Sequence, residues 1–227
     1  IRLFGTLGTS ADIGTSSTKT VITAQDGRII SSDVQQYGVL EPNPSWAEQY
    51  PDVWLDAVKR SIHNAVEKGK IEPAQVAAVC ISGLYGGSGV PLDRHMEAVR
   101  PCIIWMDRRS TEVCKRLNRE IDVSRLFEVT ENGVDSYFGY TKLLWMKENE
   151  PESWKQTELF LPPNQYVVYK LTGQIVMDVT AAGNLGGLYD MERGAWSEEM
   201  GMMLDIPLCK MPQTLLQPYE TAGTLSK

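Results

Sequence analysis

Histidine is scarce in this chain, with only His63 and His95 among 227 residues. Two separated imidazoles exclude a His-rich metal site and disfavour a catalytic triad built on histidine. The four cysteines form no Cys-x-x-Cys pair. Cys80 and Cys102 lie within apolar runs, where a cysteine usually acts as a small hydrophobic side chain. Neither residue type therefore indicates the chemistry of this chain.

Basic runs and long apolar runs are also missing. No segment is apolar over a length that could span a bilayer, and no signal peptide is recognised. Acidic residues exceed basic ones, 29 against 22, which gives a net charge of −7. These absences predict a cytoplasmic protein whose partners are neither nucleic acid nor a membrane. An anionic ligand would need a local positive field, such as backbone N–H groups or a bound metal.

The first 84 residues predict a mixed sheet and one helix in an α/β fold. Weak alternation up to Gly14 and clearer alternation over 18–25 and 28–37 predict three strands, the last two joined by an Asp-Gly turn. Apolar residues recur at helical spacing over 51–68. The near-continuous apolar run over 76–84 predicts a strand buried on both faces. The predicted order is therefore β-β-β-α-β.

The rest of the chain is mostly helical in pattern. A glycine-rich loop is followed by a hairpin turned at 93–97, and a second glycine-rich stretch covers 178–196. The other predicted elements are a short strand over 157–162 and helices over 107–121, 123–130, 138–149, 163–171 and 197–206.

The stretch Asp-Ile-Gly-Thr-Ser-Ser-Thr-Lys, residues 12–19, has two interpretations. Its residue types are ordinary for a solvated hairpin turn. They also suit a phosphate cradle, in which Asp12 holds a hydrated Mg²⁺. The residues whose backbone N–H groups, hydroxyls or charge would then face the phosphates are Gly14, Thr15, Ser16, Ser17 and Lys19. Because the Walker pattern is absent, these residues alone leave both interpretations open.

A second candidate site is the loop 82–89, which follows the apolar strand. A loop at the carboxyl end of such a strand is where α/β sheets bind ligands. Gly86 lets a ligand approach the backbone, and Tyr85 offers a ring and a hydroxyl. Tyr137 lies just ahead of a predicted helix, where its hydroxyl could face the same cleft. A flexible turn explains the glycines of this loop equally well.

The segment 103–109 combines an aromatic side chain with charges of both signs. Trp105 ends an apolar strand, and Asp107 and Arg108 open the next predicted helix. An aspartate there is often only a helix cap. An aromatic wall beside a carboxylate and a guanidinium also suits a carbohydrate, which presents apolar C–H faces and many hydroxyls.

In their order and spacing these segments resemble the amino-terminal half of the FGGY family of carbohydrate kinases, and its xylulokinase branch above all. The resemblance covers nearly the whole chain, from Ala11 to the end. The segments that carry it are DIGTSSTK (12–19), PSWAEQYPDVW (44–54), RPCIIWMDRR (100–109), YFGYTKLLWMKEN (137–149), LFLPPNQYVVYKLTG (159–173) and DVTAAGNLGGLYDMERGAW (178–196).

The resemblance implies the ribonuclease H-like, actin-like ATPase fold, a mixed sheet flanked by helices, with an inserted helical and small-strand subdomain. It implies that residues 1–227 form the amino-terminal sugar-binding domain, with the mainly helical insertion over about 107–175. The carboxyl-terminal ATP-binding domain is then absent from this chain, and so is the general base, which is expected downstream of Lys227. We therefore expect this fragment alone to be inactive.

The resemblance also implies the reaction, an ATP-dependent phosphorylation of a sugar hydroxyl assisted by Mg²⁺, with xylulose or a related pentulose as the sugar. Asp12 would order the metal through water, and the hairpin residues named above would contact phosphate oxygens. The residues implied on the sugar side are Tyr85, Gly86, Trp105, Asp107, Arg108 and Tyr137. Partners would be the sugar, the carboxyl-terminal kinase domain of the parent chain and, in a homodimer, a second copy.

Three alternatives remain at this stage. The parent could be a gluconate or other polyol kinase of the same family, because Leu84-Tyr85-Gly86-Gly87 stands where xylulokinases usually carry Gln-Met-His-Gly. The chain could be a non-catalytic carbohydrate-binding lobe, since a fold alone does not define a function. A chaperone-like ATPase domain is disfavoured by the aromatic and charged residues at 105–109.

Overall fold

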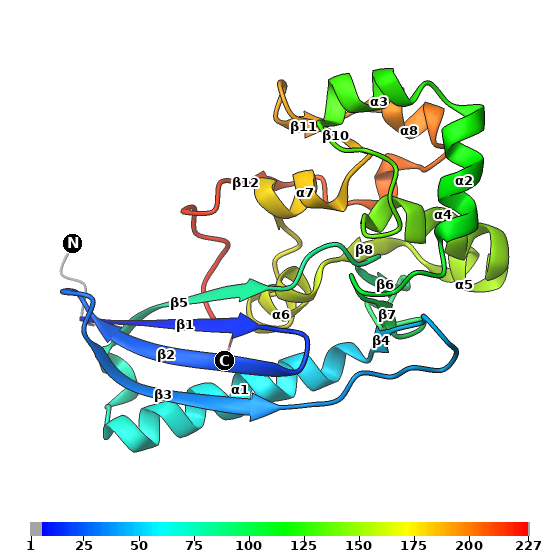
Figure 1. Cartoon of the computed structure of the whole chain (residues 1–227). Coiled ribbons are helices and arrows are strands. Elements are labelled where there is room, and N and C mark those ends of the chain that lie inside the picture. The colour runs from blue at the N-terminus through cyan, green and yellow to red at the C-terminus, as the bar shows by residue number, and fades with distance from the viewer. Residues whose placement is uncertain (1–5, 227) are drawn as a thin grey trace. The chain divides into compact units, whose positions relative to one another are not determined.

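The computed structural model describes residues 6–226, and they divide into two compact units (Figure 1). Unit 1 runs up to Val39 and continues over Asp52–Leu84. Unit 2 contains Leu40–Pro51 and the described residues from Tyr85 onward. The predicted helical segment 107–175 lies inside unit 2.

Unit 1 is a four-stranded mixed sheet with the strand order β3-β2-β1-β5. Strands β1 (Leu7–Ile13), β2 (Ser17–Ala24) and β3 (Ile29–Gln36) pair antiparallel, and β5 (Val76–Gly83) pairs parallel with β1. Helix α1 (Pro51–Gly69) lies along one face of the sheet (Figure 1). A short 3₁₀ helix, Pro73–Gln75, precedes β5. The predicted β-β-β-α-β order is confirmed.

Buried apolar residues and hydrogen bonds of hydroxyl groups join the helix to the sheet. Ile22 of β2 packs with Ala65 of α1 and with Ile71 just after the helix. The hydroxyl groups of Thr20 and Ser61 are 2.6 Å apart, and the Ser31 hydroxyl donates to the Ala65 carbonyl at 2.6 Å. Because these contacts reach β2 and β3, α1 covers the antiparallel side of the sheet.

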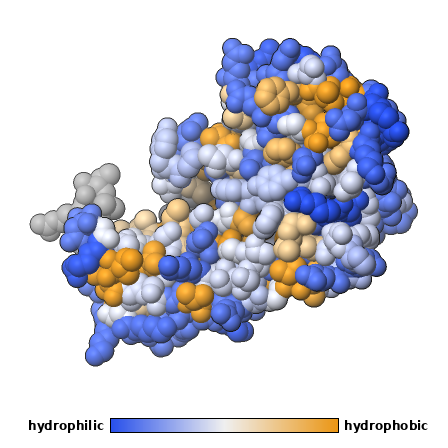
Figure 2. All heavy atoms as spheres, in the orientation of Figure 1, coloured by the Kyte–Doolittle hydropathy of each residue, from blue (hydrophilic) through white to orange (hydrophobic). Residues whose placement is uncertain are grey.

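The structure corrects the prediction for β5, which is not buried on both faces. Among the described residues β1 is its one neighbour in the sheet, so β5 lies at an edge. Ala77, Ala78, Cys80 and Ser82 are all exposed. Figure 2 accordingly shows hydrophobic residues among polar ones over the strands of unit 1. The apolar run indicates residues that are common in strands, but it does not show that both faces of the strand are buried.

Unit 2 contains two short antiparallel pairs next to its site residues. Strand β4 (Glu48–Gln49) pairs with β7 (Cys102–Ile103). Strand β6 (Val90–Leu92) pairs with β8 (Leu159–Leu161). These pairings connect segments about 50 to 70 residues apart, so they bring together loops that local sequence patterns treat separately.

The helices of unit 2 form its larger core. They are α2 (Thr111–Glu120), α3 (Val123–Thr130), α4 (Gly139–Asn149), α5 (Pro151–Gln156), α6 (Pro163–Thr172), α7 (Val179–Leu185) and α8 (Glu198–Met203). Helix α4 is central, because seven of its eleven residues are buried. Helix α2 carries the polar outer surface, which Figure 2 shows as hydrophilic spheres.

The remaining elements of unit 2 are short. They are β9 (Met177–Asp178), β10 (Tyr189–Asp190), β11 (Ala195–Trp196), a 3₁₀ helix (Leu208–Lys210) and β12 (Leu215–Leu216). The sequence predicted α3, α4, α6, α8 and β8 close to their observed bounds. It missed α5, α7 and the β10–β11 hairpin. The last two lie in the stretch 178–196, whose glycines suggested a loop.

Candidate functional site

The hairpin between β1 and β2 brings Asp12 and Lys19 directly opposite each other. Both side chains are exposed, whereas their neighbours Ile13 and Thr18 are buried. The reason is the two-residue period of a strand, which sends alternate side chains to opposite faces. The hairpin therefore presents one carboxylate and one ammonium group side by side on its exposed face.

The bend of this hairpin is held by a residue just after β3 that the sequence analysis missed. The Tyr37 hydroxyl donates to the Gly14 carbonyl at 2.7 Å and lies 3.1 Å from the Thr18 hydroxyl. Burial raises the pKa of Tyr37 to about 12, so the phenol keeps the proton it donates. A Cβ on Gly14 would lie 3.0 Å from the Ser17 carbonyl oxygen, so the tight bend favours glycine here.

The exposed face of the hairpin suits a hydrated metal and an anion better than a metal cage. Within residues 6–226 no group of three or more His, Cys, Asp or Glu side chains could hold a metal ion. Mg²⁺ usually keeps several waters and takes one or two carboxylates together with phosphate oxygens. Asp12 supplies one carboxylate, and Lys19 and the exposed Ser16 supply groups that pair with phosphate.

In unit 2 the structure brings Gly86, Trp105 and Tyr137 together, and we call these three residues the aromatic corner. The Trp105 and Tyr137 ring centroids are 6.4 Å apart, with 61° between the ring planes. Gly86 has a positive φ of 78°, and a Cβ there would lie 2.8 Å from Tyr137 Cζ and 3.1 Å from Trp105 Cβ. Glycine is therefore required at position 86, because any side chain would push the two aromatic residues away.

Tyr85 directly precedes Gly86 and Arg108 follows Trp105 by three residues, but the two side chains have different surroundings. The Arg108 side chain is 44% exposed, and its Nη1 is 3.9 Å from the carboxylate of Asp135, two residues before Tyr137. Tyr85 is half-buried and packs against Met177, Ala182 and their neighbours. Arg108 can thus reach a ligand from solvent, whereas the Tyr85 ring also helps to hold its loop.

Asp107 lies elsewhere than predicted. It comes four residues before α2 instead of opening that helix, and it is completely buried. Its carboxylate accepts the amide protons of Ala47, at 2.6 Å, and of Arg109, at 2.8 Å. It also accepts from Nε and Nη2 of the Arg109 guanidinium. The carboxylate is therefore unavailable to a ligand in this structure, which corrects the direct sugar contact predicted for it.

Asp107 belongs to a charge cluster that the sequence analysis did not find. Arg109 Nη2 is 2.7 Å from a Glu48 oxygen, and Arg100 pairs with Glu48 and, at 2.9 Å, with Glu150. These five residues, Glu48, Arg100, Asp107, Arg109 and Glu150, are the charge cluster of unit 2. Part of the signal was present in the segment 100–109, which places Arg100, Asp107 and Arg109 at the two ends of an apolar run.

Two tryptophans complete the surroundings of Arg109. Its guanidinium carbon lies 3.7 Å from the Trp46 ring centroid and 4.9 Å from that of Trp145. Aromatic faces attract a cation, and more strongly when both are desolvated. The buried arginine thus links the segment before α1, the segment before α2 and helix α4.

Lys142 of α4 is a second buried cation that the sequence analysis missed. It is completely buried, and its ammonium donates to the carbonyls of Gly86 at 3.0 Å, of Tyr137 at 2.8 Å and of Ser136. Burial lowers its pKa to about 7, although Asp107 acts in the opposite direction. Lysine is almost never fully buried unless it is paired, and here the three carbonyls are the partners of the ammonium group.

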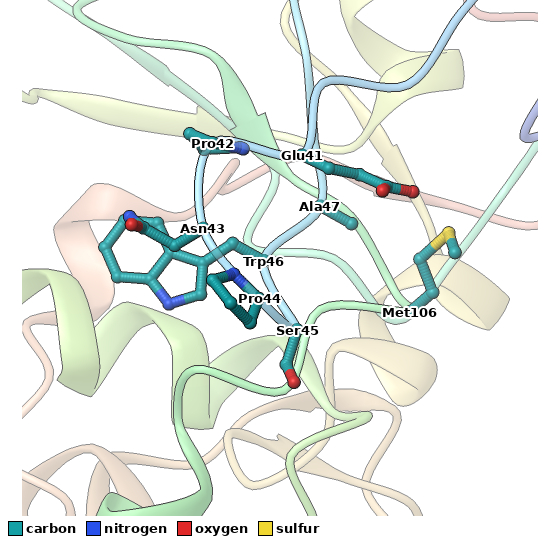
Figure 3. Close-up of a pocket in the computed structure, with 8 residues that line it drawn as sticks. All are labelled: Glu41, Pro42, Asn43, Pro44, Ser45, Trp46, Ala47 and Met106. Atoms are coloured by element: carbon teal, nitrogen blue, oxygen red, sulfur yellow. The ribbon is translucent and has the colours of Figure 1, made fainter.

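A hollow of about 370 Å³ opens beside the segment 41–47 (Figure 3). In Figure 3 the Trp46 ring lies beside Asn43 and Pro44, and Glu41 and Met106 lie on the other side. The hollow is lined by Glu41, Pro42, Asn43, Pro44, Ser45, Trp46, Ala47 and Met106. None of the residues predicted on the sugar side lines it, so we do not assign the sugar to it.

No helix within residues 6–226 combines the length and the apolar composition needed to cross a membrane.

Comparison with known proteins decides the family. The model of the amino-terminal domain of the FGGY family of carbohydrate kinases matches residues 8–227. This chain belongs to that family. The matched range includes the hairpin, the aromatic corner and the charge cluster, so FGGY membership applies to all the sites described above.

Individual relatives agree with the family model. The chain is 30% identical over 215 residues to a xylulose kinase of Bacillus subtilis, covering 94% of this chain and 42% of that protein. It superposes with a TM-score of 0.90 on a gluconate kinase from Lactobacillus acidophilus, at 23% identity, and on a "xyloylose kinase" from Brucella ovis, at 27%. Each of these superpositions covers 97% of this chain, and 44% and 45% of the other chain.

Two conclusions follow from these relatives. The actin-like ATPase fold that the resemblance implied is confirmed, because the superpositions extend over nearly the whole chain. The chain also spans less than half the length of the curated relatives it matches.

Proposed function

We propose that this chain is the sugar-binding lobe of an ATP-dependent kinase that phosphorylates a hydroxyl of a pentulose such as xylulose. The observation that carries the proposal is the aromatic corner with the exposed Arg108 beside it in sequence. A half-exposed tryptophan and a tyrosine provide both the apolar surface and the hydroxyl that a sugar needs. Membership of the FGGY family supports the same substrate class.

On the sugar side, each residue would act through a different group. Trp105 would stack on the C–H face of the sugar, and the Tyr137 and Tyr85 hydroxyls would pair with sugar hydroxyls. Gly86 would let the sugar approach the backbone, and Arg108 would donate from the solvent side. Asp107 would act indirectly, because its carboxylate is already occupied by Ala47 and Arg109.

On the phosphate side, the β1–β2 hairpin would hold ATP and Mg²⁺. The hairpin residues that would contact phosphate oxygens are Gly14, Thr15, Ser16, Ser17 and Lys19. Asp12 would hold the metal through water, and bound Mg²⁺ would neutralise charge on the phosphates. We place the base that accepts the hydroxyl proton, and the carboxyl-terminal ATP-binding domain, in the part of the relatives' length that this chain does not span.

A gluconate or other polyol kinase is the second candidate, and Arg108 is the observation that favours it. Its guanidinium is exposed and weakly paired, at 3.9 Å from Asp135. An exposed guanidinium next to the aromatic corner in sequence suits a carboxylate as well as a hydroxyl, because arginine binds carboxylates through two parallel hydrogen bonds. An aldonate would therefore use Arg108 more strongly than a neutral ketose would.

Thermal denaturation of the chain with D-xylulose, D-gluconate and glycerol tests both candidates. A ligand at about 100 times its dissociation constant stabilises the folded state by about 2.7 kcal/mol, which corresponds to about 5–10 °C in the melting temperature. We expect D-xylulose to give this shift. A shift with D-gluconate alone, lost in Arg108→Met, would favour the aldonate kinase, and no shift with any of the three would contradict the proposal.

Substitutions at the aromatic corner locate the binding site. We expect Tyr137→Phe to weaken D-xylulose binding about threefold to tenfold, because one hydroxyl pairing is lost. Trp105→Ala should weaken it by about tenfold or more, through the lost stacking surface. Tyr219→Phe is the matched control, since Tyr219 is 84% exposed. Isothermal calorimetry measures the affinities for D-xylulose. If Tyr137→Phe and Trp105→Ala bind as tightly as wild type and Tyr219→Phe, the aromatic corner is not the sugar-binding site.

A further inference from the structure

The Lys142 ammonium group joins the two loops that form the aromatic corner. Gly86, whose carbonyl it binds, belongs to the loop after β5. Ser136 and Tyr137, whose carbonyls it also binds, belong to the segment before α4. An ammonium group has three N–H donors, and all three have a carbonyl partner here. All three donors are therefore used, and two of them bind the backbone of the corner residues Gly86 and Tyr137.

The geometry of the corner depends on this contact. Gly86 Cα lies so close to the Tyr137 ring that a Cβ would come within 2.8 Å of it. Nothing covalent links the two loops, which are separated by 50 residues in sequence. Hydrogen bonds to a charged donor are stronger than neutral ones, and one charged group that binds both loops fixes their separation.

We propose that Lys142 is a positioning residue, whose ammonium group holds the Gly86 loop against the Tyr137 segment and so sets the spacing of the sugar-binding corner. The part of this inference that concerns sugar rests on the proposed function. Lys142 itself touches no solvent and hence no ligand. Its effect on sugar binding is exerted only through the backbone of the two loops.

The charge of Lys142 adds a pH dependence to this role. The groups that act on it are Asp107 and Arg108 from the segment before α2, Cys102 of β7 and Cys114 of α2. Asp135 is a further charged residue nearby in sequence, because it directly precedes Ser136, whose carbonyl Lys142 binds. The pKa of Lys142 is lowered to about 7, so the ammonium group loses its proton over a range centred near neutral pH. A neutral amine has only two N–H donors, so one of the three carbonyls is then left without its partner.

The first experiment is independent of sugar and uses nuclear magnetic resonance of the labelled chain. At about pH 6 we expect a slowly exchanging Lys142 ammonium signal, coupled through hydrogen bonds to the carbonyl carbons of Gly86 and Tyr137. The amide nitrogens that follow these carbonyls, those of Gly87 and Phe138, should shift together between about pH 6 and 8.5, with a midpoint near 7. The absence of the ammonium coupling would overturn the proposal without any variant.

The second experiment compares Lys142→Met with Lys147→Met, a lysine substitution on the same helix whose partner is the exposed Asp205. Met keeps the length of the side chain but has no donor. We expect amide hydrogen exchange in residues 84–90 and 133–138 to be about tenfold faster or more in Lys142→Met, and unchanged in Lys147→Met. Wild-type exchange rates in both loops of a folded Lys142→Met would overturn the proposal.

Calorimetry with D-xylulose separates this inference from the proposed function. We expect Lys142→Met to bind D-xylulose about tenfold more weakly than wild type at about pH 6, with a smaller ratio at about pH 8.5, where the wild-type amine is neutral. If the loops loosen but wild-type chain binds no sugar, the proposed function fails and the positioning role stands. If wild type and Lys142→Met bind D-xylulose equally at both pH values, the positioning role fails and the proposed function stands.

Discussion

Asp107 is the residue of the charge cluster that balances the buried charge of Arg109. It accepts from two backbone amides and from the Arg109 guanidinium, and neither side chain of this pair has any exposed surface. A buried ion pair contributes little when compared with a well-packed apolar pair. Removing one partner is costly, however, because the other charge then stays buried and unpaired.

We therefore expect Asp107→Asn to lower the free energy of unfolding by about 3–5 kcal/mol. The amide removes the charge that balances Arg109 and directs an NH₂ group or a weaker acceptor toward existing donors. Chemical denaturation measures the loss. Asp205→Asn is the matched control in the same unit, since the Asp205 side chain is 89% exposed, and we expect it to change stability by about 0.5 kcal/mol or less. Equal effects of the two variants would contradict the structural role of Asp107.

At this scale the structure changes the task that the sequence assigned to one residue. In 103–109 it marked Trp105, Asp107 and Arg108 as facing a sugar. The structure leaves Trp105 and Arg108 accessible and buries Asp107. The sequence pattern of this short segment does not show which of its side chains a distant segment will cover. Here Ala47 and Glu48, about 60 residues earlier, decide it.

Strand β5 shows at the scale of an element what a hydrophobic run does not encode. Its sequence is apolar from Val76 to Ile81, yet it forms the edge of the sheet in the described residues, and Cys80 is exposed. The short strand β7 is the reverse case. It has two residues, and its Cys102 is completely buried. Burial follows from the neighbours of a strand, so composition predicted one of these two cysteines correctly and the other wrongly.

This difference predicts the reactivity of the thiols. We expect Cys80 and Cys209, which are exposed, to react rapidly with a thiol reagent at about pH 8, and Cys102 and Cys114 to react only after unfolding. Burial raises the pKa of Cys102 to about 12, so almost none of it is the reactive thiolate. Counting modified cysteines over time by mass spectrometry checks this. Cys80→Ser should remove one of the two rapidly modified cysteines. Two rapidly modified cysteines in that variant, as in wild type, would contradict the assignment.

For the whole molecule, the buried Lys142 makes stability depend on pH in a definite direction. Its pKa falls from 10.5 in a model peptide to about 7 in the folded chain. Between these values the unfolded state holds a proton that the folded state has lost, so the free energy of unfolding rises with pH. Below about pH 7 both states are protonated, and this contribution is constant.

We expect the free energy of unfolding of wild type, measured relative to that of Lys142→Met, to increase between about pH 7 and 9, by at most about 1.4 kcal/mol per pH unit. Taking the difference cancels the groups common to both proteins, including Cys102, whose raised pKa lowers stability above about pH 9. Denaturant titrations at several pH values measure it. Parallel stability curves for the two proteins would show that Lys142 keeps its proton throughout, which would contradict the lowered pKa.

Family membership, the β-β-β-α-β order and most helices of unit 2 were determined by the sequence itself, because they depend on local periodicity, turn residues and the spacing of motifs. The hairpin around residues 12–19 was also visible in the sequence, and strand alternation places Asp12 and Lys19 on one of its faces. Only the tertiary structure decided which motif residues face solvent and which support them. The Tyr37 bond to the bend, the Arg109 cluster and the three carbonyls around Lys142 all join segments that are distant in sequence or invisible to side-chain patterns. Such contacts arise when the chain packs, and no local pattern of residue types specifies them.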